Sequence, residues 1–240
     1  GRRQRQMCIR DRLGFQAYQF YHLPAKNYHQ QRIWVDKDFP DLADLPLPHH
    51  AQLIFERIES LYDLNLPILV LFTSKELLLE VSENLSLQHL AQYKNGDASN
   101  IKRRFDRGEA PILLGTGSFW EGTDFSSQDK MIQIITRLPF DNPQNVFTQK
   151  MNRRLRQEGQ NPFYDYSLPV AILRLKQALG RTVRHRKQQS AVLILDNRVY
   201  TKRYSRQIRG VLSKTAPIEQ SSFHQIRQDI GPVSYTHLTL

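Results

Sequence analysis

Strands that are buried on both faces are the strongest signal in this sequence. Residues 68–72 read Ile-Leu-Val-Leu-Phe, five apolar residues without a break, and comparable short runs occupy 112–114, 131–135 and 191–195. An apolar run of strand length without polar alternation is typical of a strand inside a parallel sheet. Helical patterns separate these runs, as in βαβ units. We therefore predict an α/β fold with a mostly parallel sheet and helices on both faces.

Shorter patterns predict the remaining elements. Two more strands are expected at 32–36 and 89–93, and helices at 51–62, 73–84, 99–107 and 170–184. Thr73 and Glu76 have the spacing of a capping box, and Gly108 is placed to end the third helix. The run at 191–195 is expected to be the last strand.

The two ends of the chain do not continue these patterns. Residues 7–12 (MCIRDR) and 233–240 (VSYTHLTL) resemble translated sequencing-adapter read-through. We expect 1–12 and 232–240 to be non-native and to pack against nothing, in preference to a native basic arm and tail.

The charge balance favours a polyanionic partner. The net charge is +11 and the pI is about 9.9. Residues 1–12 hold five Arg and one Asp, so +7 belongs to the rest of the chain. Clustered Lys and Arg of this kind bind phosphate backbones.

Several classes of protein are disfavoured by the composition. No apolar run reaches the roughly 18 residues of a membrane span, and no signal peptide is apparent, so a cytoplasmic protein without membrane contact is expected. Cys8 is the only cysteine and lies in the suspect end. A single cysteine builds neither a disulfide nor a zinc or iron–sulfur site, and we assign no metal ligand.

A glycine-containing segment, GTGSFWEGTD, follows the strand at 112–114 and covers residues 115–124. Its first two glycines permit a tight turn with free N–H groups, but Trp120 stands where a dinucleotide-binding motif needs glycine. Phe119 and Trp120 are candidates for base stacking, although core packing is the commoner role of such aromatics. Glu121 and Asp124 are either hydrogen-bond acceptors for a ribose or an arginine, or ordinary loop acids.

The helix predicted at 170–184 has two distinct faces. The apolar face holds Ile172, Leu175, Leu179 and Val183, and the opposite face holds Arg174, Gln177, Arg181 and Arg184. A guanidinium group can bind a phosphate with two hydrogen bonds, so these arginines are candidates for phosphate binding. The alternative is that the basic face of this helix is simply exposed to solvent, as is usual when no other signal accompanies it. Gly180 inside the helix suggests close approach of another group.

Three segments together resemble the carboxyl-terminal motor domain of the DinG/XPD branch of superfamily 2 helicases. Residues 71–74 (LFTS) are similar to motif IV, 117–124 (GSFWEGTD) to motif V and 177–184 (QALGRTVR) to motif VI, in matching order over 50–213. The resemblance implies a RecA-like fold and an ATP-dependent DNA helicase. It also implies that 13–50 is a connector from the first motor domain and that 51–231 is the second.

The resemblance assigns roles to individual residues. Arg181 and Arg184 would be the catalytic arginines that reach ATP, with Gln177 beside them. Residues of the ATP and coupling site would be Glu121, Gly122, Asp124 and Gly180. Nucleic-acid contacts would come from Thr73, Ser74, Ser118, Phe119 and Trp120.

The implied partners are single-stranded DNA and the first motor domain of the same chain. ATP and Mg²⁺ would be held mainly by that first domain, because this sequence contains neither a G-x-x-x-x-G-K-[ST] loop nor an Asp-Glu-Ala-His box. We therefore expect no ATP turnover by this chain alone, and any iron–sulfur cluster of the family would lie outside it. One departure from the family is the segment 185–190, which reads HRKQQS where relatives usually have Asp and Gly.

Two alternatives stay open at this point. The first is a retired motor that only binds DNA and is attached to an exonuclease. The second, a generic α/β domain with incidental basic stripes, is disfavoured by the order of the motifs.

Overall fold

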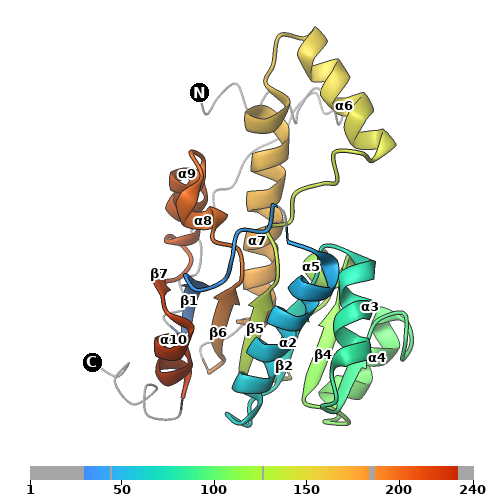
Figure 1. The fold of residues 1–240 in the computed structure, drawn as a ribbon, viewed down its shortest axis with the longest axis vertical. Helices are drawn as coiled ribbons and strands as arrows, with labels where there is room; N and C mark the ends of the chain where they lie inside the picture. The colour runs from blue at the N-terminus through green and yellow to red at the C-terminus, as the bar shows by residue number, and fades with distance from the viewer. Residues whose placement is uncertain (1–29, 44, 126, 184–186, 232–240) are drawn as a thin grey trace, which may run out of the picture.

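Seven parallel strands form a single sheet in the order β3-β4-β2-β5-β6-β1-β7 (Figure 1). The structure is a computed structural model that describes residues 30–231 except 44, 126 and 184–186. The strands are β1 (Gln31–Asp36), β2 (Ile68–Leu71), β3 (His89–Ala91), β4 (Ile112–Gly115), β5 (Lys130–Ile135), β6 (Gln189–Ile194) and β7 (Ile218–Ser221). Every pairing between neighbouring strands is parallel, which confirms the predicted sheet.

Helices connect the strands and cover both faces. They are α2 (Leu47–Tyr62), α3 (Lys75–Asn84), α4 (Ala98–Asp106), α5 (Ser118–Glu121), α6 (Val146–Gln157), the π-helical turn η1 (Phe163–Ser167), α7 (Leu168–Thr182), α8 (Arg198–Thr201), α9 (Ser205–Leu212) and α10 (Phe223–Ile230). Among the described residues, no helix is long and apolar enough to cross a membrane.

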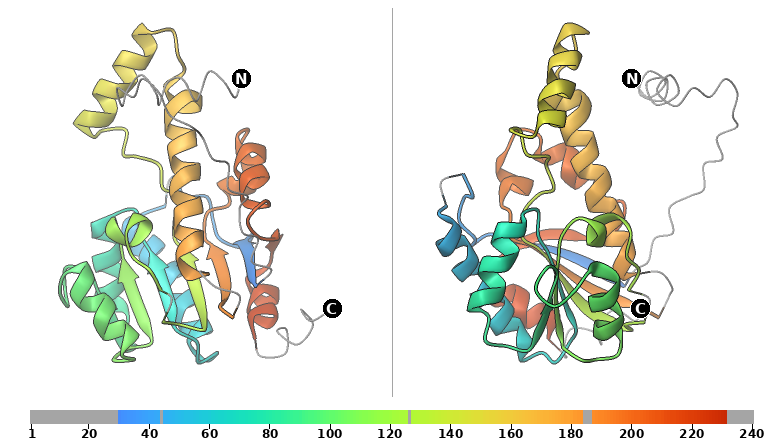
Figure 2. Two further views of the ribbon diagram at one scale, coloured as in Figure 1. Left: turned by 180° about the vertical axis from the view of Figure 1, so that it is seen from behind. Right: turned by 90° about the vertical axis from the view of Figure 1, so that its right-hand side faces the viewer.

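The core consists of two layers of apolar side chains, one on each face of the sheet. Residues of α2, α3 and α10 pack on one face, and residues of α4, α7 and α9 pack on the other (Figure 2). Alternation along β2 sends Ile68 and Val70 to the first layer and Leu69 and Leu71 to the second. Each such side chain, fully buried, contributes about 1.5–3 kcal/mol to folding. Burial on both faces explains why these strands read as unbroken apolar runs.

β1 and β7 form one end of the sheet, and only β7 was not expected. β1 confirms the strand predicted at 32–36 and pairs with β6 and β7, with Ile33 opposite Val192 and Ile218. The expectation that 191–195 is the last strand was wrong, because β7 follows it. β7 reads Ile-Glu-Gln-Ser and is partly exposed at the edge, so it lacks the apolar pattern of the central strands.

Two helix ends also differ from the sequence prediction. Ser74, not Thr73, caps α3, since its Oγ accepts from the backbone N–H of Leu77 at 3.1 Å. α7 ends at Thr182, and Val183 is already extended with φ of −137°. The prediction that the helix continues through 184 was therefore wrong. Arg184 itself lies outside the described residues, as do the two adapter-like ends and Cys8.

Residues 142–167 form a lobe that the sequence patterns did not predict. It contains α6 and the turn η1, and it stands beyond the carboxyl ends of the strands (Figures 1 and 2). We refer to these residues as the α6 lobe. Only Thr148 and Leu155 of α6 are buried, so the helix lacks a continuous apolar stripe.

Candidate functional site

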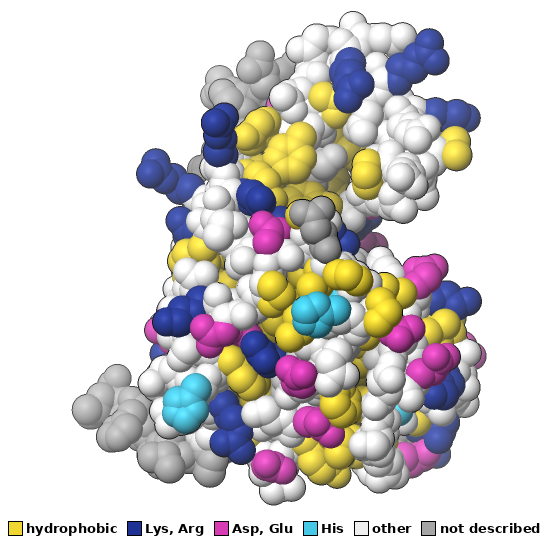
Figure 3. Space-filling model, in the orientation of Figure 1, with side chains coloured by type: hydrophobic (Ala, Val, Ile, Leu, Met, Phe, Trp, Pro, Cys, Tyr) yellow, Lys and Arg dark blue, Asp and Glu magenta, His cyan; other side chains and the backbone are white. Residues whose placement is uncertain are grey.

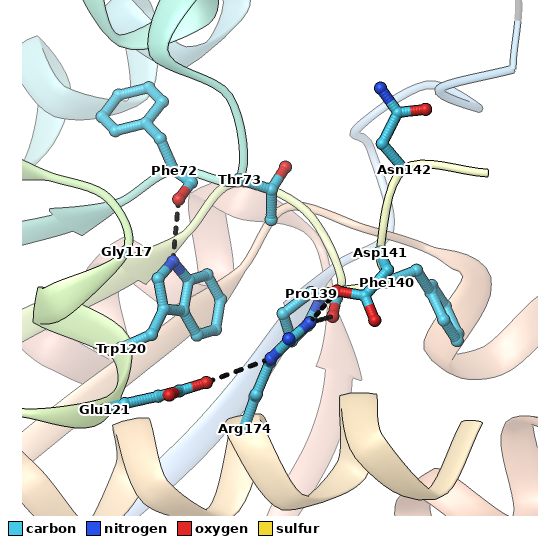
Figure 4. A pocket seen from close by; sticks show the side chains of 10 residues that line it. All are labelled: Phe72, Thr73, Gly117, Trp120, Glu121, Pro139, Phe140, Asp141, Asn142 and Arg174. Atoms are coloured by element: carbon cyan, nitrogen blue, oxygen red, sulfur yellow. Dashed lines mark hydrogen bonds and ion pairs between the residues drawn. The ribbon is translucent and has the colours of Figure 1, made fainter. Parts of the chain in front are cut away.

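A cavity of about 260 Å³ opens where β2, β4 and β5 end (Figure 4). Ligands of open parallel sheets bind at this edge. We call it the strand-end cavity, and its lining residues are Phe72, Thr73, Gly117, Trp120, Glu121, Pro139, Phe140, Asp141, Asn142 and Arg174. The structure thus brings Thr73, Trp120 and Glu121 together around one cavity.

Arg174 of α7 is the centre of the strand-end cavity. Its Nε donates to Glu121 Oε1 at 3.1 Å, and its Nη1 donates to Asp141 Oδ1 at 2.5 Å and to the carbonyl of Pro139 at 3.3 Å (Figure 4). Burial opposes the charged form, but the hydrogen bonds and charges of Asp141 and Glu121 outweigh it and raise the pKa of Arg174 above its ordinary value. Arg174 therefore ties α7 to α5 and to the loop that follows β5.

The glycines of the 115–124 segment act through packing and turn geometry. A Cβ on Gly115 would lie 2.3 Å from the ring of Phe119, so the bare backbone makes room for that ring. Gly117 has φ of +47°, which favours glycine.

The aromatics of this segment belong to the core. Phe119 is fully buried, Trp120 is 4% exposed, and the Trp120 indole N–H donates to the carbonyl of Phe72 at 2.7 Å. Of the two roles that the sequence left open for Phe119 and Trp120, the burial of both side chains supports core packing and leaves little ring surface for base stacking.

A second cavity of about 630 Å³ lies between residues 118–124 and α4. It is lined by Ala98, Ser99, Lys102, Arg103, Ser118, Gly122, Thr123 and Asp124. Lys102 also pairs with Asp106 and lies over the ring of Phe125. Ser118, Gly122 and Asp124 thus share one cavity, separate from the one that Thr73 and Glu121 line.

Arg181 lies two turns further along α7 than Arg174. Its Nη2 donates to the backbone carbonyl of Glu121, and its own carbonyl accepts from the N–H of Phe125 at 3.2 Å. Gln177, between the two arginines, is half-buried and has no hydrogen-bond partner among the described residues. No heavy atom of the described chain outside α7 lies within 4 Å of a Cβ built on Gly180, so no other backbone of this chain makes the close approach that we expected there.

A buried ion pair holds the loop that follows β5. Asp196, at the end of β6, is fully buried and accepts from the N–H of Leu138 at 2.8 Å and from Arg198 Nη2 at 2.6 Å. Leu138 precedes the residues that line the strand-end cavity. An acid directly after a buried strand was the only sequence signal for this contact, and the Arg174 to Asp141 pair had none.

Arg137 and His50 lie near this ion pair. Burial and the positive charge of Arg198 lower the pKa of Arg137. His50 of α2 is 6% exposed, and its Nε2 has no hydrogen-bond partner among the described residues. Burial, together with the charge of Arg137, lowers the pKa of His50 to about 4.

We expect the lowered pKa of His50 to make the protein acid-labile. In the unfolded chain the pKa returns to about 6.5, so between pH 6.5 and 4 the unfolded state binds the additional proton. Lowering the pH from 7 to 4.5 should therefore cost about 2 kcal/mol at this residue. Urea unfolding of wild type and His50→Gln at both pH values measures this contribution as the difference between their pH dependences. Identical pH dependences would contradict it.

No group of three or more His, Cys, Asp or Glu side chains that could hold a metal ion occurs in the described ranges. The polar side chains that line the two cavities carry guanidinium, ammonium, amide, hydroxyl and carboxylate groups.

Comparison with known proteins gives consistent results. The family described as helicase C-terminal domain matches residues 59–215. The 3'-5' exonuclease DinG of Bacillus subtilis is 32% identical over 201 residues, which are 80% of this chain and 22% of that protein. The ATP-dependent DNA helicase YoaA of Haemophilus influenzae is 28% identical over 195 residues, or 76% of this chain and 30% of that protein. The chain thus spans less than a third of these relatives.

Solved structures share the fold at low sequence identity. An XPD helicase superposes with a TM-score of 0.61 and 17% identity, covering 80% of this chain and 35% of that one. Saccharomyces cerevisiae Dbp5, solved with RNA and ADP BeF3, gives a TM-score of 0.58 at 11% identity, covering 95% of this chain and 52% of that one. These neighbours confirm the expected RecA-like fold.

Proposed function

Because this chain belongs to the helicase C-terminal domain family, we propose that it is the second motor domain of an ATP-dependent DNA helicase. In this role one surface contacts single-stranded DNA, and α7 supplies arginines to ATP held by a first motor domain of the same protein. The family match over residues 59–215 and the two bacterial relatives support the proposal.

The hydrogen bond between Arg181 and Glu121 is the observation that carries this proposal. Arg181 donates to the Glu121 backbone, while the Glu121 carboxylate accepts from Arg174 in the strand-end cavity at 3.1 Å. Glu121, at the end of α5, thus touches both the arginine assigned to ATP and the cavity that Thr73 lines. Movement of Arg181 toward a phosphate would shift the end of α5, which is the physical link that a motor needs between ATP and DNA. Gly122, Asp124 and Gly180 lie on the two segments that this link joins.

The chemistry of α7 fits phosphate better than metal. A guanidinium has five N–H donors, and the described contact of the Arg181 side chain uses Nη2 alone, which leaves donors for phosphate oxygens. Gln177 and, outside the described residues, Arg184 complete the proposed set. ATP supplies the phosphoryl group that is transferred to water, and the cationic donors of α7 stabilise the charge that develops on it. We assign Mg²⁺ to the first motor domain.

The DNA contacts are proposed for the hydroxyl groups at the strand ends. Thr73 and Ser118 are exposed beside β2 and β4, where backbone phosphates could accept their hydrogen bonds. Ser74 is less available, since its hydroxyl also contacts Glu76 at 2.9 Å while capping α3. Phe119 and Trp120 support this surface from the core and do not touch DNA.

A second candidate is a motor that binds DNA without hydrolysing ATP and is attached to an exonuclease. The observation in its favour is the 32% identity to a protein named 3'-5' exonuclease DinG. The two candidates differ in ATP hydrolysis by the whole protein, which is tested by the Arg181 variant described in the Discussion.

We expect this chain to bind single-stranded DNA weakly and with strong dependence on salt. Each phosphate contact lowers log K by about 0.7 per unit of log salt concentration on single strands, and only half of a two-domain groove is present. Fluorescence anisotropy with a labelled oligo-dT at 50, 100 and 200 mM KCl measures the slope. Salt-independent or strongly sequence-selective binding would contradict the proposal.

A truncated chain provides the matched control for that measurement. Residues 1–12 hold five of the arginines, so they could bind DNA through charge alone. A chain starting at residue 13 should retain salt-dependent binding. If binding disappears with the first twelve residues, it does not belong to the motor domain.

A further inference from the structure

Aromatic contacts join the base of the α6 lobe to the body of the domain. Phe140, Phe163 and Tyr204 form an aromatic cluster at its base, with ring centroids 5.0–5.7 Å apart. Asn145 caps α6, its side chain accepting from the N–H of Phe147 at 2.9 Å. Because Phe140 also lines the strand-end cavity, the cluster connects the base of the lobe to that cavity.

The outer surface of α6 is basic. Over residues 146–157 the helix carries Lys150, Arg153, Arg154 and Arg156 and no acidic residue. Only Arg154 forms an ion pair, with Glu158 at 2.8 Å, among the described residues. Figure 3 shows Lys and Arg side chains gathered at the outer end of this lobe. Three unpaired cations on one short helix attract an anionic partner.

A groove of about 700 Å³ follows this helix. It is lined by Pro143, Gln149, Asn152, Arg153, Arg156 and Gln157. In contrast to the strand-end cavity, this groove has no carboxylate, and its polar groups are guanidinium and amide. Asn152 Oδ1 is buried without a hydrogen-bond partner, so a bound donor would satisfy it.

An exposed aromatic side chain adjoins the basic surface. Phe147, in the first turn of α6, is 62% exposed and is followed by Lys150 one turn later. Aromatic side chains beside cations are the combination that binds single-stranded nucleic acid, because bases stack on the ring while phosphates meet the cations. An acidic protein surface would use the cations but would leave the ring without a role.

We propose that the α6 lobe is a second contact for single-stranded DNA, in addition to the strand ends. Arg153 and Arg156 bind backbone phosphates, Phe147 stacks on a base, and Asn152 accepts a hydrogen bond from a base amino group. The lobe stands beyond the carboxyl ends of the β-strands, where Thr73 also lies. A single DNA strand that leaves this edge of the sheet therefore runs toward α6 (Figure 1). This inference rests on the proposed function, because it extends the path of the same DNA strand.

The experiment measures single-stranded DNA binding by two double variants of the full-length protein. The lobe variant carries both Arg153→Ala and Arg156→Ala, and it is compared with a matched control. The control, Arg206→Ala with Lys214→Ala, removes the same charge from exposed positions on and after α9. The lobe variant should lower the affinity for oligo-dT about tenfold at 100 mM KCl and reduce the salt slope by about 1.4, as expected for two lost phosphate contacts. The control should change both quantities much less.

Single substitutions test the stacking contact. Phe147→Ala should weaken binding about fivefold or more without changing the salt slope, since a ring and not a charge is lost. Val146→Ala, at an equally exposed neighbouring position, should leave the affinity unchanged.

The outcomes separate this inference from the proposed function. If the wild-type protein fails to bind single-stranded DNA at all, the proposed function is wrong and the lobe has no DNA role. If the wild type binds but the lobe variants bind equally well, the motor assignment stands and the α6 contact is wrong. Equal losses in the lobe variant and the charge-matched control would also overturn it, because the effect would then be one of overall charge.

Discussion

Arg181→Ala is expected to lower DNA-stimulated ATP hydrolysis by the full-length protein about a thousandfold, with a much smaller effect on ATP binding. An arginine that meets the transferred phosphoryl group acts mainly on the transition state, where charge accumulates on the phosphate oxygens. Steady-state hydrolysis at saturating DNA and direct measurement of ATP affinity distinguish the two effects. Arg184→Ala should behave in the same way.

Two controls keep this result interpretable. Arg181 also donates to the Glu121 carbonyl, so its removal should cost about 1 kcal/mol of stability, which a melting curve would detect. Arg181→Lys keeps the charge but loses the fork, and should rescue little activity. If the wild type hydrolyses ATP and both alanine variants do so equally well, the assignment of these arginines is wrong. A wild type that is inactive with an intact phosphate loop would favour the non-hydrolysing alternative.

The central sheet was predictable because its strands carry their own signal. Residues of β2 are buried on both faces, so the sequence shows an apolar run that no exposed element would tolerate. β7 has no such signal, since it lies at the edge and pairs only with β1. Its place depends on backbone hydrogen bonds that any residue can form. α6 was also not predicted, because a helix with only two buried residues shows no periodic pattern of apolar side chains in the sequence.

Helix ends were harder to predict than helix interiors because distant residues fix them. The apolar period of α7 continues to Val183, but Thr182 receives hydrogen bonds from Gln31 at 3.2 Å and from Ser190 at 2.9 Å. These partners belong to β1 and β6, far away in the sequence. The end of α7, and with it the direction of the chain toward Arg184, is therefore set by tertiary contacts.

The candidate site was predictable where its residues follow buried strands. Thr73 and Glu121 follow buried strands, so their meeting at the sheet edge follows from parallel topology. Arg174 appeared in the sequence as one member of a basic stripe, but its partner Asp141 lies in a loop 33 residues away. The sequence could not decide between stacking and core packing for Phe119, because both roles use the same residue types. The space beside Gly115 places its ring in the core.

Arg198→Ala is expected to destabilise the domain by about 3–5 kcal/mol, the largest stability effect of any substitution considered. The Asp196 side chain is fully buried, and Arg198 is its cationic partner, with Nε and Nη2 both donating to it. Removing the arginine leaves a buried carboxylate that keeps its backbone donors but loses the guanidinium that donates to it. Because the N–H of Leu138 also bonds this carboxylate, the loop that leads to the strand-end cavity should loosen.

Urea unfolding of a double-mutant cycle measures this effect. Asp196→Asn combined with Arg198→Ala should be less destabilising than the sum of the two single changes. The neutral amide at position 196 leaves no unpaired buried charge when the arginine is removed. The comparison pair is Lys202 with Asp41, whose atoms are 3.5 Å apart and whose side chains are 43% and 50% exposed. Lys202→Ala should cost less than about 1 kcal/mol, as is usual for surface ion pairs. If Arg198→Ala costs no more than Lys202→Ala, the buried pair does not hold this loop, and another contact must fix the edge of the cavity.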